Sequence, residues 1–423
     1  MNHTKTLTAC WRGKSDPKPL HATEIKRVAK ALFSLQRGLT GERRLAGAGY
    51  MDTADLLGAY LLYYFPVTHR QITLALTSFL NKTDLLRRPR LRLLDVGCGP
   101  APAAAAAIDL LGSKGFSRAN IDLHLIDSSS KALQIAKKLF SEDFPNIRPT
   151  LSQGSLEKPI TLKKNRYDII LASHVVNELW KDAPDALSRR RQFLELLSDS
   201  LTEGGVLLLC EPALLETSRA AISLAVSLSQ DALRILAPCP EAINETRSCP
   251  IFEKGQPQAA SCHAEVLCEF DASVTAIAKE AGLTRESVKM TFFALQKGKK
   301  VADVQKPELR VVSDGMLNKS GRIRYLFCDG KKRFPISAVS TSKKAEAIGF
   351  FRLKRYDSVQ FENLEARGDS ERPAFGISEN TRLSVCRFSE TGNKGSQRLL
   401  QAKSRERKNV FSNKPPVKKH VRR

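Results

Sequence analysis

The ten residues LLDVGCGPAP, Leu93–Pro102, decide the fold of this chain of 423 residues. A short apolar run ends at Asp95, glycines follow at Gly97 and Gly99, and an alanine-rich segment comes next. The apolar run is typical of a buried strand, and the alanines are typical of a helix. Glycine lets the backbone turn tightly and approach a ligand at the start of that helix. The stretch therefore predicts a strand, a glycine turn and a helix whose first turn faces a nucleotide-type ligand.

Strand and helix patterns alternate along the next hundred residues. IDLHLID (121–127), YDIILAS (167–173) and GVLLLCEP (205–212) are typical of further strands, with helical periodicity between them. This alternation predicts an α/β domain with a mostly parallel sheet that is covered on both faces. Asp127 ends the second strand, where a carboxylate can accept hydrogen bonds from a ribose.

The order of strand, glycine turn and second-strand acid resembles the first motifs of class I S-adenosylmethionine (SAM)-dependent methyltransferases. The resemblance implies a Rossmann-like sheet in which Asp95 and the backbone of Gly97 and Gly99 face the methionine and ribose of the cofactor. It also implies that Asp127 binds the ribose hydroxyls. Ser155, near the predicted third strand, is the candidate for contact with the adenine. A tight turn in another kind of α/β protein is the alternative interpretation.

Residues for methyl transfer are less clear. Enzymes that methylate an exocyclic base nitrogen usually carry an Asn or Asp, two prolines and an aromatic after the fourth strand, and this chain has ASHVVNELW (172–180) there. His174 is a candidate general base, with a capping or core role as the alternative. Cys210 is a candidate nucleophile of the kind that cytosine C5 methylation requires. A cysteine in an apolar strand is more often a buried small hydrophobe.

Four of the nine cysteines lie between Cys239 and Cys268. Their odd number, irregular spacing and the absence of a secretory pattern argue against a disulfide framework. Thiolates favour zinc or iron–sulfur clusters, although paired C-x-x-C knuckles are missing. Proline follows Cys239 and Cys249 directly, as it follows one ligand of bacterial ferredoxins. The sequence therefore predicts a metal or cluster site in this stretch.

A second resemblance runs through the cysteine stretch and the segments after it. APCP (237–240), SCPIF (248–252), SCHAE (261–265), SVKMTFFALQKGKK (287–300) and RVVSDGMLNKSGRIRYLFCDG (310–330) carry it. Together they resemble the mitochondrial small-ribosomal-subunit assembly family of methyltransferase-like proteins, which has bacterial relatives. The resemblance covers roughly residues 40–335.

This family resemblance implies a [4Fe–4S] cluster bound by four cysteines. Position by position the ligands are Cys239, Cys249, Cys262 and Cys328. Cys268 is a spare thiol that could replace Cys262, because the intervals between the first three cysteines are longer here than is usual in the family. Zinc in a four-thiolate site is the alternative. Ligands drawn from distant segments favour a structural role over a redox role.

The net charge of +24, from 68 basic and 44 acidic residues, favours a polyanionic partner. Residues 394–423 contribute eleven Lys or Arg and one Glu, so much of the excess lies elsewhere. A candidate phosphate-contacting patch consists of Arg322, Arg324, Lys331, Lys332 and Arg333. An ordinary solvated hairpin is the alternative. The family resemblance implies that the partner is small-subunit ribosomal RNA (rRNA) or a precursor of that subunit.

The domain organisation follows from changes in pattern. We expect an N-terminal helical region (1–88), a methyltransferase-like domain (89–336) with a cysteine-rich insertion (237–270), a small β-rich module (337–391) and a disordered basic tail (392–423). Pro66 should end or kink a helix, and the aromatics of AYLLYYFP before it are expected on a core face.

Two functions fit these observations. The first is a SAM-dependent rRNA methyltransferase with a cluster, and the second is a non-catalytic rRNA-binding assembly factor with a structural metal. A redox-sensing regulator of translation is a variant of the second. No apolar run is long enough to cross a membrane. We expect a cytoplasmic protein, monomeric off the ribosome, with the mitochondrial matrix as the alternative location.

Overall fold

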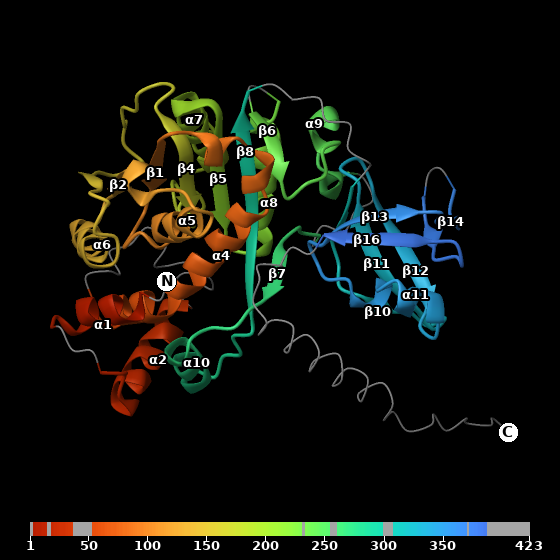
Figure 1. Cartoon of the computed structure of the whole chain (residues 1–423), viewed down its shortest axis with the longest axis horizontal. Coiled ribbons are helices and arrows are strands. Elements are labelled where there is room, and N and C mark those ends of the chain that lie inside the picture. The colour runs from red at the N-terminus through yellow and green to blue at the C-terminus, as the bar shows by residue number, and fades with distance from the viewer. Residues whose placement is uncertain are drawn as a thin grey trace.

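The computed structural model describes residues 3–14, 18–36, 53–230, 233–253, 260–298, 308–369 and 372–386. These residues form a large sheet flanked by helices and a second, smaller sheet beside it (Figure 1). The predicted tail, 392–423, lies outside the described residues.

The large sheet has the strand order β3-β2-β1-β4-β5-β8-β6, and β7 pairs with β8. Its strands are β1 (Leu91–Val96), β2 (Ile121–Asp127), β3 (Thr150–Gln153), β4 (Tyr167–Ser173), β5 (Leu201–Glu211), β6 (Leu233–Ala237), β7 (Ala264–Leu267) and β8 (Ser287–Lys297). The first five in this order are parallel, and β8 runs antiparallel to both β5 and β6. The order reverses at β1, which is the topological switch point where α/β sheets bind ligands.

Helices cover both faces of this sheet, as predicted. Alternate residues of β1 point to opposite sides, so that Leu93 and Leu94 belong to different cores. The core of Leu93 includes α4 (Phe65–Thr77), α5 (Pro102–Ser113) and α6 (Ser130–Asp143). The core of Leu94 includes α7 (Ala186–Ser200) and α8 (Leu215–Leu228). The insertion adds α9 (Ile243–Thr246) and a 3₁₀ turn at Pro250–Phe252, and α10 (Ala272–Glu280) follows it.

The N-terminal region is helical. It contains α1 (Thr4–Arg12), α2 (Ala22–Gln36), α3 (Ala54–Ala59), a π-helical segment η3 (Tyr60–Tyr64) and α4, with 3₁₀ turns at Leu80–Lys82 and Leu85–Arg87; a further 3₁₀ turn at Arg118–Asn120 precedes β2. The predicted break at Pro66 takes the form of this π-helical segment. The N–H of Phe65 donates to the carbonyl of Tyr60, five residues back. Pro66 then lies in the first turn of α4, where its missing N–H costs little.

The second sheet has the order β14-β15-β12-β11-β9-β13-β16, with β10 beside β11. Its strands are β9 (Leu309–Val311), β10 (Met316–Leu317), β11 (Arg322–Cys328), β12 (Arg333–Val339), β13 (Ser358–Glu362), β14 (Glu365–Ala366), β15 (Phe375–Gly376) and β16 (Arg382–Cys386), with α11 (Lys343–Ala347) and a 3₁₀ turn at Phe350–Arg352. The predicted domain boundary at residue 336 is therefore wrong. Strand β9 pairs with both β11 and β13, and a common core joins all three, so the module begins near residue 308.

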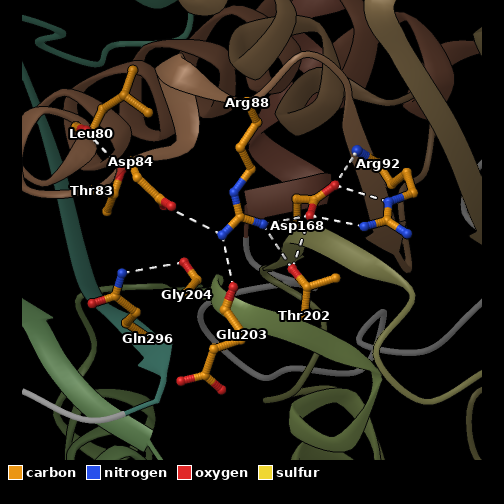
Figure 2. A network of polar contacts seen from close by, with 10 residues as sticks. All are labelled: Leu80, Thr83, Asp84, Arg88, Arg92, Asp168, Thr202, Glu203, Gly204 and Gln296. Atoms are coloured by element: carbon orange, nitrogen blue, oxygen red, sulfur yellow. Dashed lines mark hydrogen bonds and ion pairs between the residues drawn. The ribbon is translucent and has the colours of Figure 1, made fainter.

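A buried ion-pair network fixes the large sheet at the end where β1 and β4 begin (Figure 2). Asp168 on β4 is 1% exposed and accepts hydrogen bonds from the guanidinium groups of Arg88 and Arg92, at 2.6 and 3.0 Å. The backbone N–H of Arg92 and the hydroxyl of Thr202 also donate to it. This network leaves the opposite end of the strands free to form a site.

Candidate functional site

A cleft of about 1430 Å³ lies at the carboxyl ends of β1, β2 and β4. Of the residues predicted to bind SAM, the cleft is lined by Gly97, Gly99, Asp127 and Ser155, and His174 lines it as well. The N-terminal helices cover one side of it and the segment after β4 covers another. The tertiary structure thus brings together residues that lie almost eighty positions apart in the chain.

The glycine turn requires glycine for two reasons. Gly97 and Gly99 have φ values of +62° and +53°, in the left-handed region that other residues rarely adopt. A Cβ atom on Gly97 would also overlap the side chain of Val175. The turn therefore keeps its backbone close to the segment after β4, at the floor of the cleft.

The two acids of the predicted cofactor site have different roles. Asp95 is 1% exposed, and the described residues that line the cleft do not include it. Its Oδ2 accepts the N–H of Ala104 at 3.0 Å, and burial raises its pKa to about 8. Contact between Asp95 and the cofactor therefore stays a prediction. Asp95 is a positioning residue that ties the start of α5 to β1.

Asp127 does face the cleft. Its carboxylate accepts the N–H groups of Gly99 and Ser129, each at 2.8 Å. Burial raises its pKa. These two bonds hold the carboxylate against the glycine turn, and the backbone N–H of Ser128 donates to it as well. A ribose diol is a donor pair suited to this position.

The segment after β4 is strained and held from both sides. His174 and Trp180 have φ values of +57° and +49° although neither is glycine. Such conformations persist where surrounding contacts impose them, and they cluster at functional sites. On the β5 side, buried Glu211 accepts hydrogen bonds from the backbone and the side-chain amide of Asn177, at 3.2 and 2.6 Å. Burial raises the pKa of Glu211 to about 8.

Gln71 on α4 holds the other side of this segment and sets the tautomer of His174. The Nε2 of Gln71 donates to the backbone carbonyl of Lys289 at 2.8 Å, so its Oε1 must be the atom that lies 2.9 Å from His174 Nε2. The imidazole therefore carries its proton on Nε2 and a lone pair on Nδ1. Burial lowers the pKa of His174 to about 4, so the ring is neutral near pH 7.

Sequence reasoning missed two aromatic residues of the cleft. Tyr63 lies in the core as predicted, but Tyr60 and Tyr64 line the cleft, with ring centroids 6.2 Å apart. The π-helical segment widens the helix here and changes which side chains face the sheet. An aromatic run directly before a helical proline is the signal that could have indicated them.

Cys210 is not among the described residues that line the cleft, although its backbone carbonyl accepts the N–H of His174 at 2.7 Å. It is fully buried on β5 among core residues, with its Sγ 3.9 Å from the sulfur of Met290. Burial raises the pKa of its thiol, which opposes formation of the nucleophilic thiolate. The candidate nucleophile is thus a core residue.

The four predicted metal ligands line one small cavity. Cys239 follows β6, Cys249 precedes the 3₁₀ turn at Pro250–Phe252, Cys262 precedes β7 and Cys328 ends β11. The described residues around this cavity do not include Cys268, which is buried at the end of β7. The cavity therefore joins the insertion to the second sheet.

Three observations bear on the kind of metal centre that this cavity could hold. No three of its sulfurs all lie within 4.8 Å of one another in the part of the chain that the structure describes, whereas thiolates on one zinc ion lie about 3.8 Å apart. The Gly330 N–H donates to the sulfur of Cys328 at 3.4 Å, the kind of bond that tunes cluster ligands. Burial raises the pKa of Cys249 and Cys328 to about 12, so these thiols need a bound cation to remain thiolates.

The close approach of the β11–β12 turn depends on Gly330. Its φ is +94°, and a Cβ there would lie 2.7 Å from the backbone nitrogen of Ile243. An ion pair of 2.9 Å between Lys331 and Glu245 crosses the same contact. The turn thus brings Cys328 to the insertion.

The predicted basic patch separates into two groups. Arg324 is exposed at the start of β11, and Arg322 beside it donates to the Ser337 hydroxyl at 3.1 Å. Lys331, Lys332 and Arg333 lie in and after the turn at the other end of the strand. At about 3.3 Å per residue the two groups are separated by roughly 13 Å.

Residues 55–355 match the model of a protein family described as mitochondrial small ribosomal subunit Rsm22. The match spans more than half of the chain. This chain belongs to the Rsm22 family. No curated protein sequence matches it. Its large mixed sheet with helices on both faces has the α/β architecture that the sequence predicted.

Solved structures of methyltransferases are similar to this chain at low identity. A Listeria monocytogenes protein assigned to class I SAM-dependent methyltransferases is 12% identical, with a TM-score of 0.34 over 72% of this chain and 81% of that one. The plantazolicin methyltransferase BpumL in complex with SAH is 15% identical, with a TM-score of 0.30 over 66% and 98%. An rRNA methylase from Streptococcus thermophilus is 12% identical, with a TM-score of 0.28 over 50% and 89%.

The description of the Rsm22 family is mitochondrial, which agrees with the alternative location. The predicted cytoplasmic location has no support from it. Within the described ranges, no helix has the length and apolar character needed to cross a bilayer.

Proposed function

We propose that this Rsm22-family protein binds SAM in the cleft and acts on rRNA of the small ribosomal subunit as a methyltransferase. One observation carries the proposal: Gly97, Gly99, Asp127 and His174 meet in a large cleft at the switch point of the sheet. The family supports the ribosomal partner, and the net charge of +24 supports binding to nucleic acid.

Some residues of the cleft would bind the cofactor, and others would bind the acceptor base. Bound SAM would supply the electrophilic methyl group. Asp127 would accept hydrogen bonds from its ribose, the Gly97–Gly99 backbone would pack against it, and Ser155 lies at the rim where the adenine is expected. Tyr60 and Tyr64 offer ring faces for stacking on a base.

His174 is the residue that we propose as general base. Its Nδ1 carries a lone pair because Gln71 fixes the proton on Nε2. Its low pKa keeps that lone pair available at neutral pH. The left-handed backbone at His174, held through the Glu211–Asn177 hydrogen bonds, fixes the ring at the cleft.

We further propose that Cys239, Cys249, Cys262 and Cys328 hold a [4Fe–4S] cluster. The sulfur spacing supports a cluster over a single zinc ion, and the Gly330 N–H and the buried thiols suit a metal centre of either kind. Its role would be structural, because its ligands come from the insertion and the second sheet and binding would fix one against the other.

A non-catalytic assembly factor is the second candidate function. The segment after β4 lacks the paired prolines of enzymes that methylate exocyclic nitrogens, and this observation favours it. Such a protein would keep SAM binding and rRNA binding without methyl transfer.

The test begins with anaerobically purified full-length protein, assayed for iron, acid-labile sulfide and zinc. Methyl transfer from labelled SAM into small-subunit rRNA and its precursor particles is then measured, with SAM binding followed separately by calorimetry. We expect about four irons and four sulfides per chain and transfer that His174→Gln abolishes without loss of SAM binding. SAM and rRNA binding without transfer would leave the assembly factor as the function. Stoichiometric zinc in place of iron would overturn the cluster.

A further inference from the structure

Two histidines and an aspartate meet on the outer side of α4, away from the cleft. His3 precedes α1, His69 lies on α4 and Asp109 lies on α5. One ligand-type atom from each lies within 4.8 Å of the other two. The side chains are 4%, 19% and 9% exposed, so the group is nearly enclosed but reachable from solvent beside His69.

The distances match those of ligands around one metal ion. The Nε2 atoms of His3 and His69 lie 3.0 and 3.2 Å from the same oxygen, Oδ2 of Asp109. Ligands about 2.0–2.1 Å from a tetrahedral zinc ion lie about 3.3 Å apart. Each imidazole nitrogen is therefore about as far from the shared carboxylate oxygen as two zinc ligands are from each other, and the two nitrogens lie within 4.8 Å of one another.

Neighbouring side chains orient these ligands. The Nδ1 of His3 lies 2.6 Å from Oδ2 of Asp143, the last residue of α6, and the hydroxyl of Thr6 donates to the other oxygen of Asp143 at 2.7 Å. Metal-binding histidines usually donate their second ring N–H to a carboxylate in this way. Arg118 donates to the remaining oxygen of Asp109 at 3.3 Å and fixes that carboxylate.

We propose that His3, His69 and Asp109 form a zinc site, with Asp143 as the carboxylate that orients His3. Three protein ligands leave the fourth tetrahedral position to water. Imidazole and carboxylate ligands suit zinc, whereas Mg²⁺ favours oxygen ligands.

The location gives this ion a structural role. His69 and Gln71 are two residues apart on α4 and so lie about 200° apart around the helix. One face of α4 therefore holds the zinc site and the other holds His174. Asp109 lies two turns along α5 from the glycine turn. Zinc would fasten α1 to the two helices that support the cleft.

The experiment uses Co²⁺ as a spectroscopic replacement for Zn²⁺ on the full-length protein, stripped by a chelator under anaerobic conditions. Thiolate ligands give Co²⁺ an intense charge-transfer absorption, whereas imidazole and carboxylate ligands do not. Metal bound at the cysteines is thus distinguished from metal bound at this site. We expect the protein to bind one Co²⁺ ion that shows no thiolate band. One equivalent of Zn²⁺ should displace this ion, and Mg²⁺ should not. Zn²⁺ should also raise the Tm by a few degrees.

Variants assign the site. His69→Gln should no longer bind the Co²⁺ ion that lacks the thiolate band. Asp143→Asn, which keeps all three ligands, should weaken the affinity for this ion about 10- to 100-fold. The matched control is His21→Gln, because His21 is an exposed histidine of the same N-terminal region. The proposal would be overturned if wild-type protein bound no Co²⁺ that lacks the thiolate charge-transfer absorption. The proposal would also be overturned if both His69→Gln and Asp143→Asn bound this Co²⁺ ion with the affinity of the wild type.

Discussion

The side-chain oxygen of Gln71 lies 2.9 Å from Nε2 of His174 and thereby decides which nitrogen of that imidazole carries a proton. Gln71 comes from an N-terminal helix and His174 from the end of β4, 103 positions further along the chain. The contact orients a neutral histidine at the cleft, and it makes the proposed base testable through its pH dependence.

The first prediction concerns this pair. In wild-type protein the rate of methyl transfer should be flat between pH 6 and 8, because the pKa of His174 is about 4. Gln71→Glu places a carboxylate beside Nε2–H and should raise the pKa of His174, so that the rate falls as the pH decreases towards 6. His174→Gln should lower kcat by about 10²- to 10⁴-fold with little change in SAM affinity. Thr73→Ala, on the same helix, is the control. Equal pH profiles for Gln71→Glu and wild type would show that His174 is not the base.

The second prediction concerns the glycine turn. Gly97→Ala combines an unfavourable φ with an overlap with Val175, and should abolish measurable SAM binding. Gly115→Ala is the matched control, since Gly115 has a φ of +85° and nothing within 4 Å of its added Cβ. It should cost about 1 kcal/mol of stability and leave SAM binding intact. Calorimetric titration with SAM measures both, and wild-type affinity in Gly97→Ala would remove the turn from the cofactor site.

The third prediction concerns assembly of the cysteine site. Gly330→Ala should lower the iron content at least as far as Cys328→Ser does, because the added Cβ pushes the β11–β12 turn away from Ile243. Gly321→Ala is the matched control, since Gly321 has a similar φ of +71° but open space around it. Cys268→Ser should keep its iron. Iron lost from Cys268→Ser and kept in Cys262→Ser would instead make Cys268 the ligand in place of Cys262.

The fourth prediction concerns stability and pH. Burial raises the pKa of Glu211 from 4.5 to about 8. The stability that its protonated form contributes is complete below pH 4.5 and is lost as the pH rises through about 8. The free energy of unfolding should therefore decrease from pH 5 to pH 8, with a contribution from Glu211 on the order of 4 kcal/mol.

Glu211→Gln should flatten this pH dependence, since glutamine stays neutral and Asn177 can turn its amide to match it. Part of the slope should remain, because Asp95 has its pKa raised to about 8 for the same reason. Urea denaturation at several pH values gives the slopes. An unchanged slope in Glu211→Gln would mean that Glu211 is already ionised in the folded protein at pH 5.

Much of the cofactor site could be predicted from local sequence. The turn at Gly97 and Gly99 and the acid at Asp127 are recognisable because each depends on a strand end and its nearest neighbours in the chain. Tyr60 and Tyr64 could not be assigned, since a π-helical segment changes which side chains face the core and no simple periodicity encodes it. Gln71 could not be assigned because its role depends on contacts with His174 and Lys289.

By itself the sequence determined the class of the fold and the nucleotide-type turn. These features follow from periodicity and short motifs, in which the physical cause lies within a few residues. Only the tertiary structure decided that β9, β11 and β12 belong to the second sheet, that Asp95 supports the cleft from beneath, and that His3, His69 and Asp109 meet. Strand pairing and side-chain convergence depend on how helices and sheets pack, and residues far apart in the chain become neighbours only when that packing is complete.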